Sequence, residues 1–315
     1  MLTITRQTSL FATLLLIVTI VMCIVRLSLN TYPIESAECS FLPRWWECIA
    51  ATTMLLVAGF IVNRAAVKVG LFSGFSTLPV SLFGFISCGV FLSPDILVAT
   101  AASMLTAFGT MFLIRSIQFL NDKESLFTGA LLLGTTVIIY PPCITLVAIL
   151  LLSVFIFPLS FRQIVIAFAG YLLPIVGTIY VGWYLGGNIM DVPQNIYNTI
   201  TSYTNPLFTL ESIPFCAIAL TALLTMILLY GVMVGIYHRY TLLVPVRKTI
   251  QLLLWMVIIT IATLLIPGSG ITMLPVIAVP AAVIAAFALD RMTQRWANIY
   301  YIALIVVILL HLFLY

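Results

Sequence analysis

Charged side chains are scarce in this sequence: only 7% of its 315 residues are Asp, Glu, Lys or Arg, whereas 63% are hydrophobic. A soluble domain is ordinarily about 25% charged and about 45–50% apolar. Thirteen basic and nine acidic residues are too few to give a chain of this length a water-facing surface. The composition therefore excludes an ordinary soluble fold. It predicts an all-α polytopic transmembrane helix bundle with the lipid bilayer as its main partner.

Clustered metal ligands and clustered basic residues are also missing. Six cysteines occur without a Cys-x-x-Cys pair and without Cys and His at metal-ligand spacing, which argues against a metal-thiolate site. His238 and His311 have no such spacing either and are interpreted as structural. The net charge is +4, but the basic residues stand singly between apolar stretches. This pattern indicates a role in membrane topology and not nucleic-acid binding.

Eleven apolar stretches are long enough to cross a bilayer, for which a helix needs about 20 residues at ~1.5 Å rise each. They lie near residues 8–29, 45–62, 71–92, 94–114, 125–140, 142–160, 163–185, 213–237, 249–267, 271–289 and 297–315. The fifth and sixth are short and meet at Tyr140-Pro141-Pro142, where the prolines predict either a tight turn or a re-entrant pair. We expect ten to twelve spans in a single integral membrane domain, residues 1–315.

The basic residues predict the orientation of these spans. With a cytoplasmic N-terminus, the C-terminus is exterior and only Arg26 and Arg44 of the thirteen basic residues fall outside. The basic residues inside are Arg6, Arg64, Lys68, Arg115, Lys123, Arg162, Arg239, Arg247, Lys248, Arg291 and Arg295. Arg6 precedes the first apolar run as in a signal peptide, but that run is long enough to span, so we interpret it as a retained anchor. These spans predict a multi-pass membrane protein, and the resemblance described below implies the inner (plasma) membrane as its location.

The first exterior loop, about residues 30–44, holds the strongest candidate site. Glu35 and Glu38 are three residues apart, so on a helical turn they share a face on which they can bind a divalent cation or act as a base. Arg26 and Arg44 flank them, and an arginine fork matches the oxygens of a lipid phosphate. The alternative interpretation is that all four are solvated loop charges, with Arg26 reaching the membrane interface.

Two cysteines lie close to the same loop. Cys39 and Cys48 flank Trp45-Trp46, and in an oxidising compartment they can form a disulfide. Two separate thiols are the equal alternative, with Cys48 buried in the second span. The two tryptophans are typical of an interfacial aromatic belt.

The second exterior loop, about residues 186–212, contains no Lys or Arg. It carries Asp191 and Glu211 together with Tyr197 and Tyr203. Loops of this length are often functional, and this mixture suits a surface that lies over a membrane cavity or stacks on a sugar. The alternative is a plain connection between spans.

One internal similarity points toward transport. The stretch from Ser73 to Val80 matches the stretch from Ser269 to Val276 at five of eight positions, and the two spans run in opposite directions. Proline- and glycine-interrupted helices in inverted halves mark the binding site of some transporters. Ionisable residues deep inside the spans are nearly absent, which disfavours an ion-coupled carrier.

Several short landmarks together resemble a family of uncharacterised polytopic inner-membrane proteins of Bacteroidota. They are Asn63-Arg64, Ser125–Gly129 through Pro141-Pro142, Phe161-Arg162 followed by Gly170–Pro174, Val279-Pro280, and Arg295-Trp296. The resemblance runs from about residue 60 to the C-terminus. It implies a Gram-negative envelope protein and supplies no catalytic residues.

The layout is more distantly similar to GT-C glycosyltransferases, which use polyprenyl-phosphate sugars and keep an acidic motif in the first exterior loop. Glu35 and Glu38 stand in that place. The sequence departs from the GT-C pattern, which usually has adjacent or alternate acids, and it lacks a large exterior domain.

Three functions follow as hypotheses. The first is a GT-C-like transferase or another handler of lipid-linked glycan, with Glu35 or Glu38 as base or metal ligand. In it, Arg26 and Arg44 hold the phosphate of a polyprenyl-linked substrate. The second is a non-enzymatic subunit or scaffold with envelope protein partners. The third is a lipid or solute transporter.

Overall fold

The computed structural model describes residues 44–72, 77–87, 95–118, 122–156, 160–201, 215–237, 242–266, 269 and 271–314. Over these residues the fold is all-α, without strands, which confirms the predicted fold class. The helices are α2 (Arg44–Val69), α3 (Leu78–Ser87), α4 (Ile96–Gln118), α5 (Lys123–Ile139), α6 (Val147–Ile156), α7 (Phe161–Tyr184), α8 (Asp191–Thr201), α10 (Phe215–Tyr237), α11 (Val244–Thr263), α12 (Leu274–Arg291) and α13 (Gln294–Leu314), with two 3-10 segments, η4 (Pro141–Leu146) and η5 (Ile271–Met273).

Every predicted span from residue 45 onward contains helix, although the helix described within 71–92 is only Leu78–Ser87, and the first span, near 8–29, lies outside the described residues. Five helices in the described ranges are long and apolar enough to cross a membrane. They are Trp46–Val69, Ile96–Gln118, Phe161–Tyr184, Val244–Thr263 and Leu274–Arg291. Shorter apolar helices cover Leu78–Ser87, Pro141–Ser153 and Ala222–Tyr237. The protein therefore has the helices of a membrane protein.

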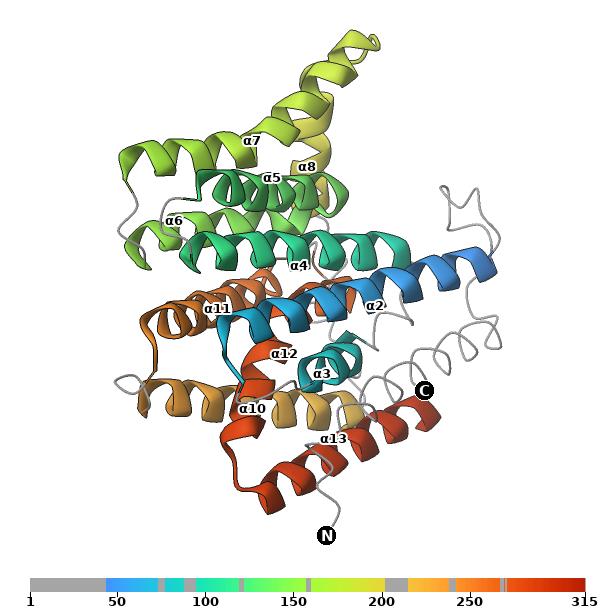
Figure 1. Ribbon diagram of the computed structural model, residues 1–315. Helices are drawn as coiled ribbons and strands as arrows, with labels where there is room; N and C mark the ends of the chain where they lie inside the picture. Colours follow the sequence, from blue (N-terminus) through green and yellow to red (C-terminus); the bar gives the residue numbers. More distant parts are fainter. Residues whose placement is uncertain are drawn as a thin grey trace.

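The helices form a layered bundle (Figure 1). Helices α7, α5, α4 and α2 pack side by side in that order, and α6 packs on α11. Helix α12 crosses the other helices steeply and contacts α3, α10, α11 and α4. The core of the molecule therefore lies around α12.

Small side chains explain why α12 occupies the centre. All fifteen residues from Pro275 to Leu289 are buried, and six of them are alanine. A helix that is apolar all round needs neighbours or lipid on every side, and small residues let neighbouring backbones approach closely. On α10, a Cβ atom added to Gly231 would lie 2.8 Å from the Cγ2 atom of Ile284. The contact between α10 and α12 therefore depends on the absence of a side chain at Gly231, opposite Ile284.

Basic residues collect at one end of the bundle, which we call the basic end. The ends of α2, α4 and α12 and the beginnings of α5, α7, α11 and α13 lie there, on the left in Figure 1. They carry Lys68, Arg115, Arg291, Lys123, Arg162, Arg247, Lys248 and Arg295. Helix α8 lies toward the opposite end, which we call the α8 end.

Two local predictions have clear outcomes. A turn at Tyr140 separates α5 from η4, so the two prolines interrupt the helix as expected. The predicted exterior loop, about residues 186–212, contains the short helix α8. Val192, Ile196 and Ile200 are spaced four residues apart, and each is half-buried. A rule that looks for about 20 continuous apolar residues misses an amphipathic helix of this length.

Candidate functional site

The predicted acidic site is not among the described residues. Arg26, Glu35 and Glu38 lie outside them, and Arg44 is described only as the first residue of α2. Within the described ranges, no three His, Cys, Asp or Glu side chains are grouped closely enough to hold a metal ion. The proposed cation at Glu35 and Glu38 stays a prediction.

The predicted disulfide also stays a prediction. Cys39 lies outside the described residues, whereas Cys48 is in the second turn of α2 and is 2% exposed. The alternative in which Cys48 is buried in the second span matches this position.

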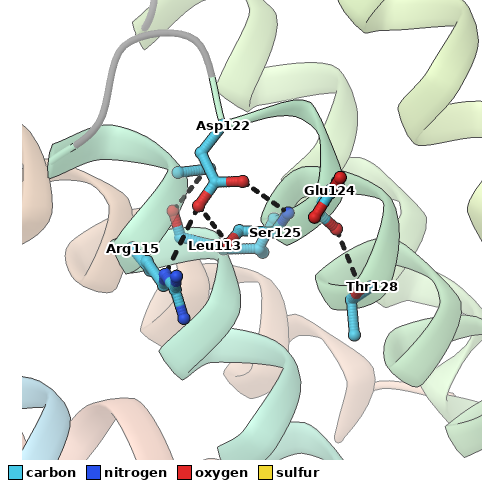
Figure 2. Close-up of polar contacts among 7 residues, drawn as sticks. Leu113, Arg115, Asp122, Glu124, Ser125 and Thr128 are labelled. Atoms are coloured by element: carbon cyan, nitrogen blue, oxygen red, sulfur yellow. Dashed lines mark hydrogen bonds and ion pairs between the residues drawn. The ribbon is translucent and has the colours of Figure 1, made fainter.

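An ionic cluster joins α4 to α5 at the basic end (Figure 2). The Asp122 carboxylate precedes α5 and accepts hydrogen bonds from the Ser125 backbone N–H at 3.1 Å and from the Ser125 hydroxyl at 2.5 Å. Arg115, in the last turn of α4, places its Nε atom 3.3 Å from the same carboxylate. The hydrogen bonds from Ser125, and then the charge of Arg115, hold the pKa of Asp122 below its ordinary value. Asp122 is thus a helix cap that also ties two helices together.

An open apolar groove lies between α5 and α7. Its volume is about 590 Å³, within the range of ligand pockets. The lining residues are Thr135 and Ile138 on α5, and Pro174, Gly177, Thr178, Val181, Gly182 and Leu185 on and just after α7. The groove is open along one side, so in a membrane it faces lipid.

At one end of the groove, α5 and α7 pack closely and leave no space between them. A Cβ atom on Gly170 would lie 2.8 Å from the Phe127 carbonyl oxygen, and a Cβ atom on Gly134 would overlap the Tyr171 carbonyl. The two helices can touch along this seam only because both positions are glycine.

Beyond this seam the two helices separate. Pro174 lies inside α7, where it removes a backbone hydrogen bond and bends the helix. Figure 1 shows the second half of α7 directed away from the bundle. A Cβ atom on Gly177 or Gly182 would meet nothing within 4 Å, so the space beside them is open. The glycine seam and the proline bend together produce the groove.

Helix α8 lies near the open end of the groove. It packs against α7 and against η4, and it follows a turn in which Gly186 has a φ of 93°. The neighbouring turn at Tyr140 is fixed to the core, because the Tyr140 hydroxyl lies 2.7 Å from the Thr272 hydroxyl just before α12. The Tyr171 hydroxyl donates to the Ile144 carbonyl at 3.2 Å. These hydrogen bonds fix the Tyr140 turn to the segment before α12 and η4 to α7, and α8 packs against η4.

The helices that begin in the two segments of the internal similarity pack against each other, whereas residues 73–76 and 270 of those segments lie outside the described residues. Leu78-Pro79-Val80 begins α3 and Leu274-Pro275-Val276 begins α12, and the two helices are in contact. All ten residues of α3 are buried. The match therefore corresponds to a pair of buried helices that begin alike.

Comparison with known proteins gives no relative: no protein family, curated protein or solved structure matches this chain. The resemblances to the Bacteroidota family and to GT-C enzymes are thus without support from these comparisons.

Sequence reasoning missed the groove. Pro174, Gly177 and Gly182 lie within one predicted span, and that concentration of helix-bending and small residues was the available signal. The partner helix was not predictable, since α5 and α7 are separated in sequence by η4 and α6.

Proposed function

We propose that this chain is a multi-pass protein of the inner membrane that handles a lipid-linked glycan of the cell envelope, with the lipid chain in the α5–α7 groove. The observation that carries this proposal is the groove itself. It is apolar, it opens sideways, and its last lining residue, Leu185, is followed in the chain by a segment rich in Asn, Tyr and Thr. Such a site suits a ligand with an apolar chain and a polar head.

The position of the basic end supports the orientation that belongs to this proposal. Basic residues accumulate on the cytoplasmic side of membrane proteins. Helices α5 and α7 both begin at the basic end, so the groove, which involves their last turns, falls in the exterior half of the membrane. Lipid-linked glycans are used on that side of the envelope in the transferases that the sequence resembles.

The catalytic part of the proposal concerns the first exterior loop. In it, Glu35 or Glu38 acts as a base or binds a divalent cation, and Arg26 and Arg44 hold a lipid phosphate. The experiment replaces both acids, Glu35→Gln with Glu38→Gln, and measures the glycolipid composition of the membrane in cells that depend on this chain. Loss of the product at normal protein levels is the expected result. An unchanged composition would overturn the catalytic assignment.

The groove is tested by photocrosslinking in native membranes. A p-benzoyl-phenylalanine is placed at position 178 inside the groove, and in a matched control at position 229, where Leu229 of α10 is 66% exposed. Position 178 should capture one lipid class that is enriched over the bulk lipid captured at position 229. The same lipid mixture at both positions would contradict the proposal. A stoichiometric protein at position 178 in place of lipid would instead indicate the scaffold function.

The α3–α12 pair supports a second candidate, a lipid or solute transporter. Buried helices that begin alike and belong to spans of opposite predicted direction are found at the binding sites of inverted-repeat transporters. Transport of a fluorescent glycolipid by the purified protein in liposomes tests this candidate. A rate equal to that of empty liposomes would exclude it.

A further inference from the structure

We infer that the α5–α7 groove is specific for a neutral glycolipid, one whose headgroup carries hydroxyls and no phosphate at the membrane surface. This inference rests on the proposed function, since it names the class of lipid that the same groove binds.

The inside of the groove selects for a hydrocarbon chain. Its only side-chain hydroxyls belong to Thr135 and Thr178, and both bond back to their own helices. Thr135 donates to the Leu132 carbonyl at 2.7 Å, and Thr178 donates to the Ile175 carbonyl at 2.8 Å. The rest of the lining is apolar, and the groove is open along one side. A hydrocarbon chain, and no polar group, therefore suits this surface.

The headgroup of such a lipid emerges at the turn between α7 and α8. Leu185 is the last lining residue, and the turn that follows it ends at Asp191. The Asp191 carboxylate accepts a hydrogen bond from the Asn188 backbone N–H at 2.8 Å. Both side chains are exposed, so an amide and a carboxylate face the solvent where the headgroup leaves the groove.

The charges around this point decide the kind of headgroup. The groove is lined by α5 and α7, and η4 and α8 pack beside these helices. The basic residues of these four elements, Lys123 and Arg162, lie at the basic end. The sequence has no Lys or Arg between Arg162 and Arg239. Of the charged residues in α5, η4, α7 and α8, Asp191 is the one that lies at the α8 end, and its carboxylate is negative.

An anionic headgroup at this position would meet a negative charge with no cation on these elements to balance it. Sugar hydroxyls, in contrast, donate to carboxylates and exchange hydrogen bonds with amides. The groove ligand is therefore a second lipid, the glycolipid that accepts or carries the sugar, and it is distinct from the phosphate-bearing donor proposed for Arg26 and Arg44.

The test uses two photoactivatable lipids that share one diazirine-bearing acyl chain. One has a single glucose as its headgroup, and the other has phosphoglycerol. The full-length protein in nanodiscs is labelled with each, and the label on α7 is quantified by mass spectrometry. We expect the glucose lipid to label α7 about fivefold more, the effect of roughly one surface charge on an anionic headgroup.

A charge exchange at Asp191 gives the decisive comparison. Asp191→Lys should reverse the preference toward the phosphoglycerol lipid, while Asp191→Asn, which keeps an acceptor for the Asn188 N–H, should reduce it without reversal. Asp290→Lys at the basic end is the matched control and should leave the preference unchanged.

Equal labelling by both lipids, or a preference for phosphoglycerol in the unmodified protein, would overturn the inference. Failure of both lipids to label α7 would instead overturn the proposed function, because no chain then occupies the groove.

Discussion

Gly134 of α5 lies directly against the carbonyl oxygen of Tyr171 in α7, so close that a Cβ atom at position 134 would overlap that oxygen. This contact fixes where α5 and α7 touch and therefore where the groove beyond them begins. A backbone atom is the obstacle, so a rotamer change in a side chain cannot relieve the overlap.

Replacing this glycine should destabilise the helix pair. We expect Gly134→Ala to lower the free energy of unfolding by about 1–3 kcal/mol, the usual cost of overpacking, since one helix must shift away from the other. Thermal or SDS-induced unfolding of the purified protein in mild detergent measures the effect. Gly177→Ala is the control, because a Cβ atom there meets nothing within 4 Å. Equal stability of the two variants would show that the α5–α7 contact is looser than described.

Removing the Asp122 cap should loosen the α4–α5 connection. Asp122→Ala eliminates two hydrogen bonds to Ser125 and the ion pair with Arg115, and loss of a helix cap costs about 1 kcal/mol. The same unfolding assay measures this loss. Glu124→Gln is the matched control, because Glu124 is exposed and accepts the hydrogen bond from the Thr128 hydroxyl through its backbone carbonyl, which the substitution keeps. A control variant as unstable as Asp122→Ala would contradict the capping role.

The contribution of Asp122 should depend on pH. Its pKa is lowered in the folded protein, so its stabilising effect is complete above the ordinary value of 3.8 and is lost as the pH falls through the lowered folded-state pKa. The difference in unfolding free energy between the unmodified protein and Asp122→Asn should therefore be constant near neutral pH and shrink below about pH 4. A difference that grows in acid would have the wrong sign for this carboxylate.

The buried hydroxyl pair should couple the Tyr140 turn to α12. Tyr140→Phe and Thr272→Val each remove one hydroxyl of the 2.7 Å contact, so either substitution eliminates this hydrogen bond. In a double-mutant cycle, we expect a coupling energy of about 1 kcal/mol, as for a neutral hydrogen bond. Additive effects of the two substitutions would show that the contact contributes nothing to stability.

The proline bend should be needed for lipid capture. Pro174→Ala restores the backbone N–H inside α7, straightens the helix and brings Val181 closer to Ile138. Crosslinking from position 178 should then fall severalfold, with unfolding stability unchanged or raised. Pro193→Ala, at an exposed position in the first turn of α8, is the control. Undiminished capture by Pro174→Ala would show that the bend does not form the site.

Composition and apolar run length were enough to predict the class of this protein and the positions of most helices. An apolar run of about 20 residues can cross a membrane as a helix, because a helix satisfies its backbone hydrogen bonds within the same segment. The prolines at 141 and 142 likewise predicted the break between α5 and α6, because a proline inside a helix acts locally on its own chain.

The groove, in contrast, was decided by tertiary structure. Its two walls come from helices that are not consecutive, and its shape depends on which glycine of α5 meets which backbone atom of α7. Helix α8 and the Tyr140–Thr272 contact also depend on tertiary structure. Helix α8 needs a neighbouring surface against which its apolar stripe can pack, and the contact joins residues 132 positions apart. The sequence by itself determined that helices form and where they stop, because those effects act over a few residues. Which helices touch, and what space they leave, is determined by packing between segments distant in the chain.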